Sequence, residues 1–189
     1  MCPKRASTGP ILVQPPPEQR WASEDATSEQ RAQGAETGKG FKVAYAFLNK
    51  RERTEAEVRE RLERAEVQPE EIEMVVAELL EFGYLDDARY ARVFTEDKRN
   101  LEAWGSERIA RALRGRGVER ALIEAALAQT EVAEGAELDR AIALLGQRFP
   151  GGPAEPRDRE RAFGVLARKG YESEMASDAV REWARRAAA

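Results

Sequence analysis

The stretch VRERLERAEVQPEEIEMVV, residues 58–76, decides the fold, because its apolar pattern returns twice later in the chain. It returns at residues 109–127, a shift of 51 positions (109 minus 58), and at residues 162–180, a further shift of 53 (162 minus 109). The repeated apolar positions are Val58, Leu62, Val67, Ile72 and Val76; Ile109, Leu113, Val118, Ile123 and Leu127; and Ala162, Leu166, Tyr171, Ala176 and Val180. One pattern kept through two unequal shifts predicts a three-fold repeat.

Apolar residues spaced by three and four, with few β-branched runs, predict that each repeat is built from short amphipathic helices. Thr54 and Glu57 fit a capping box, and Pro69 fits the first turn of a helix. Residues of the kind that end helices follow three apolar segments, namely Gly83, Gly117 and Gly170. Glu66 stands where the second and third repeats carry Gly117 and Gly170, so the turn of the first repeat lacks a glycine cap.

A further helix precedes each repeated pattern, around residues 45–50, 88–98 and 138–148, which makes three helices per repeat. We therefore predict an all-α protein with three tandem three-helix repeats in an elongated, curved arrangement, preceded by a disordered tail. The tail, residues 1–40, contains a run of three prolines and little apolar periodicity, and its five basic and five acidic residues cancel. The predicted repeats are 41–85, 86–130 and 131–189.

Composition excludes several classes of site. The 189-residue chain has no histidine, which excludes catalytic triads and histidine–metal sites, and Cys2 is its only thiol, so no disulfide forms within one chain. No apolar run approaches the roughly 20 residues of a membrane span, and the start lacks a signal-peptide core. We also find neither a GxxxxGK[ST] nor a GxGxxG loop. We expect a cytoplasmic protein that is not an enzyme, needs no cofactor or metal and touches no membrane.

Asp86 and Asp87 lie side by side at the start of the second repeat and invite an acid–base or metal interpretation. Adjacent residues diverge on a helix, however, and no third ligand is near them in the sequence. An aspartate that caps a helix N-terminus, followed by a favourable charge in the first turn, is the simpler interpretation. We therefore predict that this pair is a structural cap.

The same region carries a family resemblance. GYLDDARYARVF (residues 83–94), followed by WGSERIARALRGRGVERALIEAAL (residues 104–127), resembles the RecX family of RecA regulators, and RERTEAEVRERL (residues 51–62) looks like its first helix pair. The matching motif residues, for which we expect a mainly structural role, are Gly83, Tyr84, Leu85, Asp86, Asp87, Arg89, Tyr90 and Ala91. The second-repeat matches are Gly105, Arg108, Ile109, Leu113, Gly117, Val118 and Ile123. The resemblance covers about residues 42–185.

This resemblance implies a regulator that binds the RecA filament on DNA and mainly restrains its assembly, ATP hydrolysis, strand exchange and induction of the SOS response. The expected partner is therefore the RecA filament, with weak DNA contact inside it, and any ATP belongs to RecA. We expect the chain itself to be a monomer. Two other interpretations stay open: a stand-alone DNA-binding protein with helix-turn-helix-like units, and a helical adaptor for an unrelated partner.

The charge is unevenly distributed although the net formal charge is −4. Residues 42–85 carry 7 basic and 11 acidic residues, residues 86–130 carry 9 and 8, and residues 131–189 carry 10 and 11. Only the middle repeat is net positive. Its candidate contacts to RecA or to phosphate are Arg108, Arg111, Arg114, Arg116 and Arg120. The alternative is a solvated helix face with salt bridges.

Aromatic residues offer a second set of candidates. Trp104, Tyr84 and Tyr90 could stack on bases or anchor an interface, although packing within or between repeats is the more common role for such residues. Trp183 lies near the C-terminus on a segment with Val180, and we predict that it belongs to the core.

Overall fold

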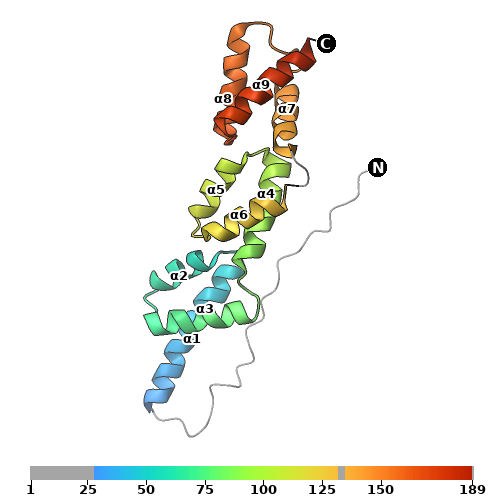
Figure 1. Cartoon of the computed structure of the whole chain (residues 1–189). Coiled ribbons are helices and arrows are strands. Elements are labelled where there is room, and N and C mark those ends of the chain that lie inside the picture. Colours follow the sequence, from blue (N-terminus) through green and yellow to red (C-terminus); the bar gives the residue numbers. More distant parts are fainter. Residues whose placement is uncertain (1–27, 132–134, 189) are drawn as a thin grey trace, which may run out of the picture. The chain divides into compact units, whose positions relative to one another are not determined.

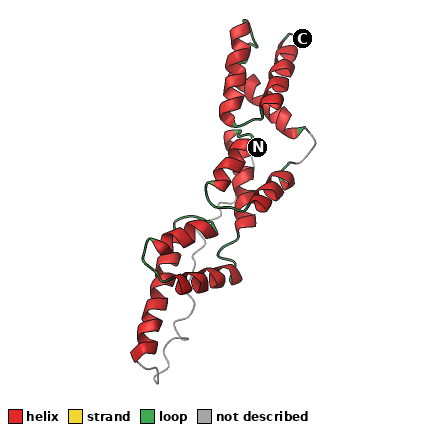
Figure 2. Cartoon of the chain, turned by 60° about the vertical axis from the view of Figure 1, so that its left-hand side comes forward, coloured by secondary structure: helices red, strands yellow, loops and turns green. Residues whose placement is uncertain are grey.

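The computed structural model describes residues 28–131 and 135–188, with side chains from residue 38 onward. Within these ranges the chain forms helices and no strands (Figures 1 and 2). The helices are α1 (Ser28–Leu48), α2 (Glu55–Glu63), α3 (Pro69–Glu81), α4 (Asp87–Glu102), α5 (Ser106–Arg114), α6 (Arg120–Gln129), α7 (Ala136–Arg148), α8 (Pro156–Lys169) and α9 (Ser173–Ala187). The predicted all-α class with three helices per repeat is confirmed.

The chain divides into two compact units, one ending at Asp87 and the other beginning at Ala88. The first unit contains α1, α2 and α3 around one hydrophobic core, which includes Tyr45, Leu62 and Leu79. The second unit contains two cores. One joins α4, α5 and α6 around Ile109 and Leu113, and the other joins α7, α8 and α9. The three cores correspond to the three repeats, whereas the exact boundaries at residues 85 and 130 stay a prediction.

The repeated apolar pattern forms these cores. Fourteen of its fifteen positions are buried, and the exception, Leu127, packs partly buried against the second core. The third repeat carries the small residues Ala162 and Ala176, and its core also contains Trp183, which is 4% exposed and lies 5.8 Å from Phe149 between ring centroids. The prediction that Trp183 is a core residue is confirmed.

The turn between the second and third helices is the same in all three repeats. Glu66 (φ 55°), Gly117 (φ 77°) and Gly170 (φ 83°) all adopt left-handed backbone conformations. The next residue donates its N–H to the carbonyl of the core leucine, with N–O distances of 3.2, 3.2 and 3.1 Å for Val67, Val118 and Tyr171. Glu66 therefore adopts a conformation that glycine reaches without the steric cost of a Cβ.

Two predicted helix starts are confirmed, whereas the predicted boundary of the N-terminal tail is wrong. Thr54 and Glu57 form the capping box of α2, and Pro69 begins α3. The predicted tail was too long, however, because α1 begins at Ser28 and ends at Leu48, so residues 28–40 belong to a helix. Buried residues such as Phe41 and Ala44 anchor the C-terminal half of α1, and propagating an existing helix costs far less than nucleating one. The predicted disorder of residues 1–27 lies outside the described residues.

Candidate interaction surface

The five arginines predicted as partner contacts lie on α5, in the turn after it and at the start of α6. The apolar face of α5 buries Ile109 and Leu113, which places Arg111 and Arg114 on its exposed side. Arg120 at the start of α6 is exposed and pairs with Glu124 at 2.6 Å. The structure thus presents three of the five guanidinium groups to solvent, and their role in partner binding stays a prediction.

Arg108 and Arg116 are instead engaged in packing. The Arg108 guanidinium lies 4.0 Å from the centroid of the Trp104 ring, and Nη1 donates to the carbonyl oxygen of Arg168 at 3.0 Å. Arg116 donates to the carbonyl oxygen of Ala112 at 2.7 Å and lies over Phe94. A guanidinium held by an aromatic face and a carbonyl is positioned by the fold, so a substitution there disturbs packing as well as charge.

The Arg108 contact belongs to a wider junction between the start of α5 and the end of α8. Gly105 donates its N–H to the Lys169 carbonyl at 2.9 Å, and Glu107 donates to the Gly170 carbonyl at 3.2 Å. A Cβ on Gly105 would lie 2.3 Å from the Gly170 carbonyl oxygen. Only glycine permits this approach, which joins the second and third repeats within one compact unit.

Trp104 and the two tyrosines mostly serve packing. The Trp104 ring is half-buried, meets Phe94 edge to face at 6.3 Å and is covered by Arg108. Tyr90 is buried in the second core, and Tyr84 meets Tyr45 edge to face at 5.7 Å. These rings therefore have limited free area for stacking on bases.

Asp87 lies in the first turn of α4, as predicted, and it also accepts a hydrogen bond from a second helix. The predicted N-cap role of Asp86 stays a prediction. Asp87 begins α4, yet its Oδ1 accepts a hydrogen bond from the backbone N–H of Glu55, the first residue of α2, at 2.9 Å. Burial raises the pKa of Asp87 above its ordinary value, and the hydrogen bond from Glu55 opposes that rise. The local pattern gave no sign of this second role, because it contains no information on which other helix end lies nearby.

A second carboxylate acts in the same way within the other unit. Glu137, in the first turn of α7, accepts from the backbone N–H of Ser106 at 2.7 Å and from its hydroxyl at 2.7 Å. Ser106 begins α5, whose N-cap residue, Gly105, has no side chain to accept these bonds. In two repeats, therefore, an acidic residue in the first turn of the next repeat's first helix accepts a hydrogen bond from the N-terminus of the middle helix.

A buried arginine missed by the sequence analysis extends this junction. Arg99 on α4 is only 5% exposed, pairs with Glu131 at 3.0 Å and donates to Thr130 Oγ1 at 2.6 Å and to Ser106 Oγ at 3.1 Å. Burial lowers its pKa from the usual arginine value. The sequence could have indicated this burial, because Ala91, Thr95 and Arg99 are spaced by four residues and therefore lie on the same, buried face of α4.

Arg140 completes the network by pairing with Glu131 at 2.7 Å. Tyr171 lies close enough to feel these charges, and burial raises its pKa to about 12. The network joins residues of the second and third repeats, with two arginines balanced by Glu131 and Glu137. Such a balanced, largely buried set favours a defined geometry between neighbouring repeats.

A basic groove on the third repeat was also missed. It encloses about 540 Å³ and is lined by Arg148, Phe149, Arg157, Glu160, Arg161, Gly164, Val165 and Arg168. Arg157, Arg161, Gly164 and Arg168 follow at spacings of four, three and four, so they form one stripe along α8. The excess of acidic residues over the whole repeat concealed this local positive charge. Arginine forks on one helix face suit phosphate or carboxylate groups.

Other kinds of site are not seen in the described part of the chain. No group of three or more cysteine, aspartate or glutamate side chains there is arranged to hold a metal ion. Among the described helices, none is both long and apolar enough to cross a membrane.

Comparisons with known proteins agree with this geometry. Models of the RecX first and second three-helix domains match residues 41–79 and 86–127. Regulatory protein RecX of Deinococcus radiodurans is 34% identical over 95% of this chain and 89% of its own length. That of Streptomyces coelicolor is 30% identical over 83% and 86%.

A solved structure shares the fold. The crystal structure of RecX from Lactobacillus salivarius superposes with a TM-score of 0.68 at 19% identity, over 79% of this chain and 97% of that one. The repeat pattern, the Gly83–Tyr90 motif and the identity over nearly the whole length of the Deinococcus relative lead to one conclusion. The chain belongs to the RecX family of regulatory proteins.

Proposed function

We propose that this chain regulates RecA, mainly as an inhibitor. It binds the RecA nucleoprotein filament and modulates filament assembly, ATP hydrolysis, strand exchange and SOS induction. Family membership over nearly the full length of the Deinococcus relative is the observation that carries this proposal. The protein has no catalytic role of its own and acts as a cytoplasmic monomer.

Several weak contacts suit this role. Separate three-helix repeats on one chain can engage neighbouring subunits of a polymer, so that modest contacts add through effective concentration. In the second repeat, the exposed Arg111 and Arg114 lie on the outer side of α5. In the third repeat, the stripe of Arg157, Arg161 and Arg168 offers weak contact with DNA inside the filament.

The first experiment measures the DNA-dependent ATPase rate of RecA from the same organism with substoichiometric amounts of this protein. The binding of the protein to the same DNA without RecA is measured in parallel. The proposal expects suppressed hydrolysis and weak, salt-sensitive binding to free DNA. An unchanged ATPase rate together with tight binding to free DNA would favour the alternative of a stand-alone DNA-binding protein.

A charge-reversal pair tests the second repeat. Arg111→Glu with Arg114→Glu changes two exposed side chains and leaves the packed Arg108 in place. The matched control is Arg92→Glu with Arg181→Glu, which reverses the same charge at two other exposed positions. The proposal expects the α5 variant to lose about tenfold or more in filament affinity while the control stays within about threefold. Equal losses would remove α5 from the interface.

A further inference from the structure

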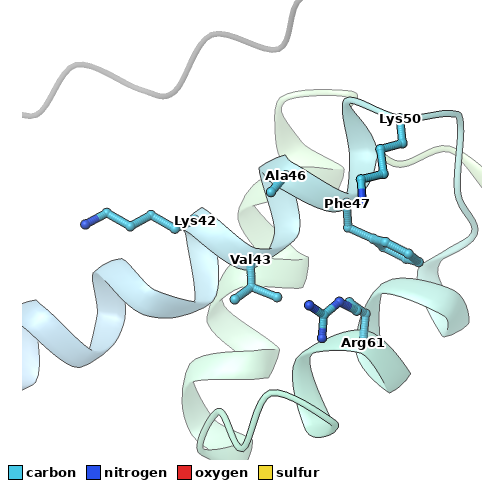
Figure 3. A pocket seen from close by; sticks show the side chains of 6 residues that line it. All are labelled: Lys42, Val43, Ala46, Phe47, Lys50 and Arg61. Atoms are coloured by element: carbon cyan, nitrogen blue, oxygen red, sulfur yellow. The ribbon is translucent and has the colours of Figure 1, made fainter.

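A shallow groove lies on the first repeat, between α1 and α2. Lys42, Val43, Ala46, Phe47 and Lys50 line it from α1 and the turn that follows, and Arg61 lines it from α2. The groove holds about 250 Å³. In Figure 3, Val43 and Phe47 on α1 face Arg61 on α2, with Lys42 and Lys50 toward opposite ends. The lining therefore combines an apolar floor with a rim of three cations.

The basic residues of the first repeat divide into two groups. Residues 42–85 carry seven basic side chains. Four of them, Arg51, Arg53, Arg59 and Arg64, pair with glutamates of the same repeat. The other three have no ion pair among the described residues, and all three line the groove: Lys42, Lys50 and Arg61.

The acidic residues show the converse distribution. The same range contains eleven acidic residues, yet none lines the groove. A repeat with an excess of four negative charges thus presents one surface that is solely cationic. Random placement in so acidic a segment would mix the two signs, as on the groove between α7 and α9, where Asp139, Asp178 and Glu182 accompany three arginines.

The floor is held in place by the core beneath it. Val43 and Phe47 are half-buried and pack against the first core, while Ala46 is exposed. The Arg53 guanidinium lies 3.9 Å from the Phe47 ring centroid, which fixes that ring further. The rim consists of long, exposed side chains that can follow a ligand. The groove is therefore a fixed apolar surface with adjustable positive charges.

We propose that this groove binds an acidic, amphipathic segment of a protein partner. An apolar side chain of the segment rests on Val43, Ala46 and Phe47, and its carboxylates pair with the three rim cations. The volume is below the roughly 300 to 1,000 Å³ of small-molecule sites, which favours one or two peptide side chains over a cofactor. An apolar floor offers nothing to a sugar–phosphate backbone, so charge and apolarity together favour a protein segment over nucleic acid. The inference does not depend on RecA being the partner.

The test uses fluorescence anisotropy with a labelled synthetic helical peptide, in which leucines at i and i+4 are surrounded by glutamates. A peptide of the same composition with the leucines dispersed, and one with every glutamate replaced by glutamine, serve as ligand controls. The proposal expects binding of the first peptide to the full chain and about tenfold or more weaker binding of each control. A mixed-sequence single-stranded oligonucleotide is tested in parallel.

Two charge-matched protein variants localise the binding. Lys50→Glu with Arg61→Glu reverses two rim charges, whereas Arg51→Glu with Arg64→Glu reverses two exposed cations that pair with glutamates outside the groove. The groove variant is expected to bind the peptide about tenfold or more weakly, and the control within about threefold. Ala46→Glu, at an exposed position on the floor, should weaken binding by a comparable factor while circular dichroism shows an unchanged helix content.

Several outcomes would overturn the proposal. These are the absence of peptide binding by the unmodified chain, equal losses in both charge-reversal variants, and equal affinity for the two leucine arrangements. Tighter binding of the oligonucleotide, lost in the groove variant, would assign the groove to phosphate. Concentration-dependent self-association that the groove variant abolishes would assign it to a second copy of the chain.

Discussion

The first and second repeats share a pattern of apolar residues but differ in how the N-terminus of the middle helix is capped. In the first, α2 carries its own capping box of Thr54 and Glu57, three residues apart, and Arg59 pairs with Glu55 four residues away. In the second, the start of α5 depends on Glu137, 31 residues away, and Arg108 reaches the Arg168 carbonyl 60 residues away. The start of α2 therefore has a local cap in addition to the Asp87 carboxylate, whereas the start of α5 depends on a residue of the repeat that follows.

The two sets of cations differ accordingly. Arg99 and Arg108 are committed to packing around the junction of the second and third repeats, whereas Lys42, Lys50 and Arg61 have no ion pair among the described residues. A count of basic residues ranks the middle repeat first as a binding surface. Side-chain environment shows that part of that charge is used for the fold and is unavailable to a partner.

The largest expected effect comes from breaking the distant contacts. Arg99→Met removes the buried ion pair with Glu131, which keeps Arg140 as a partner, and the hydrogen bonds to Thr130 and Ser106. It should lower the free energy of unfolding by about 3 kcal/mol. The counterpart in the first repeat, Arg59→Met, removes two partly exposed pairs, with Glu55 and Glu73, and should cost about 1 kcal/mol. Urea unfolding followed by circular dichroism measures both. Equal costs would contradict the distinction between the repeats.

Alkaline pH should lower the free energy of unfolding, because two buried tyrosines must then ionise. Burial raises the pKa of both Tyr171 and Tyr45 from 10.0 to about 12. Because the pKa is higher in the folded than in the unfolded chain, each neutral tyrosine contributes its full share to the free energy of unfolding below pH 10. That share is lost as the pH rises from 10 toward about 12. Each tyrosine therefore accounts for up to about 2.7 kcal/mol, at about 1.36 kcal/mol per pH unit.

Tyr171→Phe should remove its share of this loss, as judged by urea unfolding across the same pH range, and Tyr45→Phe is the counterpart in the first repeat. The two differ in their surroundings, since Tyr171 feels Arg140, Glu137 and Arg99 whereas Tyr45 feels Tyr84 and Glu78 of its own repeat. An unchanged alkaline loss in Tyr171→Phe would show that other groups dominate the titration.

The helix caps should differ by a smaller amount. Glu137→Ala removes the carboxylate that accepts from the Ser106 N–H and should cost about 1–2 kcal/mol. Asp87→Ala should cost less, about 1 kcal/mol, because α2 keeps its cap from Thr54. Thermal unfolding of the two variants makes the comparison. A larger loss for Asp87→Ala would mean that Thr54 is the weaker cap.

The smallest expected effect lies in the repeated turn, and its sign differs between repeats. Glu66→Gly should stabilise the first repeat by up to about 1 kcal/mol, since glycine relieves the cost of a Cβ at φ 55°. Gly117→Ala should destabilise the second repeat by about 1 kcal/mol for the converse reason. Shifts in the urea midpoint at an unchanged slope would measure both. A destabilised Glu66→Gly variant would reveal a contact of the Glu66 side chain that outweighs the strain.

Much of the fold could be predicted because local chemistry determines it. The fifteen repeated apolar positions, the capping box and the proline at the start of α3 all depend on residues a few positions apart. The predicted tail failed at residues 28–40, where α1 continues from the part anchored by the core. The first-turn position of Asp87 on α4 was predicted, but its hydrogen bond from Glu55 was not, because that bond depends on a helix end 32 residues away.

The candidate surfaces were less predictable. A sequence shows that Arg108, Arg111 and Arg114 lie close together, but not that Arg108 is covered by contacts with Trp104 and the Arg168 carbonyl. It likewise gives no sign that Lys42, Lys50 and Arg61 meet at one groove, since Arg61 lies on a different helix from Lys42. Neither the number of charged residues in a repeat nor the helical periodicity shows which side chains from different helices lie close together.

The sequence by itself determined the helical class, the three-fold pattern and the family resemblance, because helix periodicity, caps and motifs are properties of neighbouring residues. Only the tertiary structure decided which charged groups are used up by the fold and which are left for a partner. That choice depends on distances and burial between residues far apart in the chain. Arg99, 5% exposed within a network, and Arg61, exposed at the edge of a groove, are the same residue type in opposite environments.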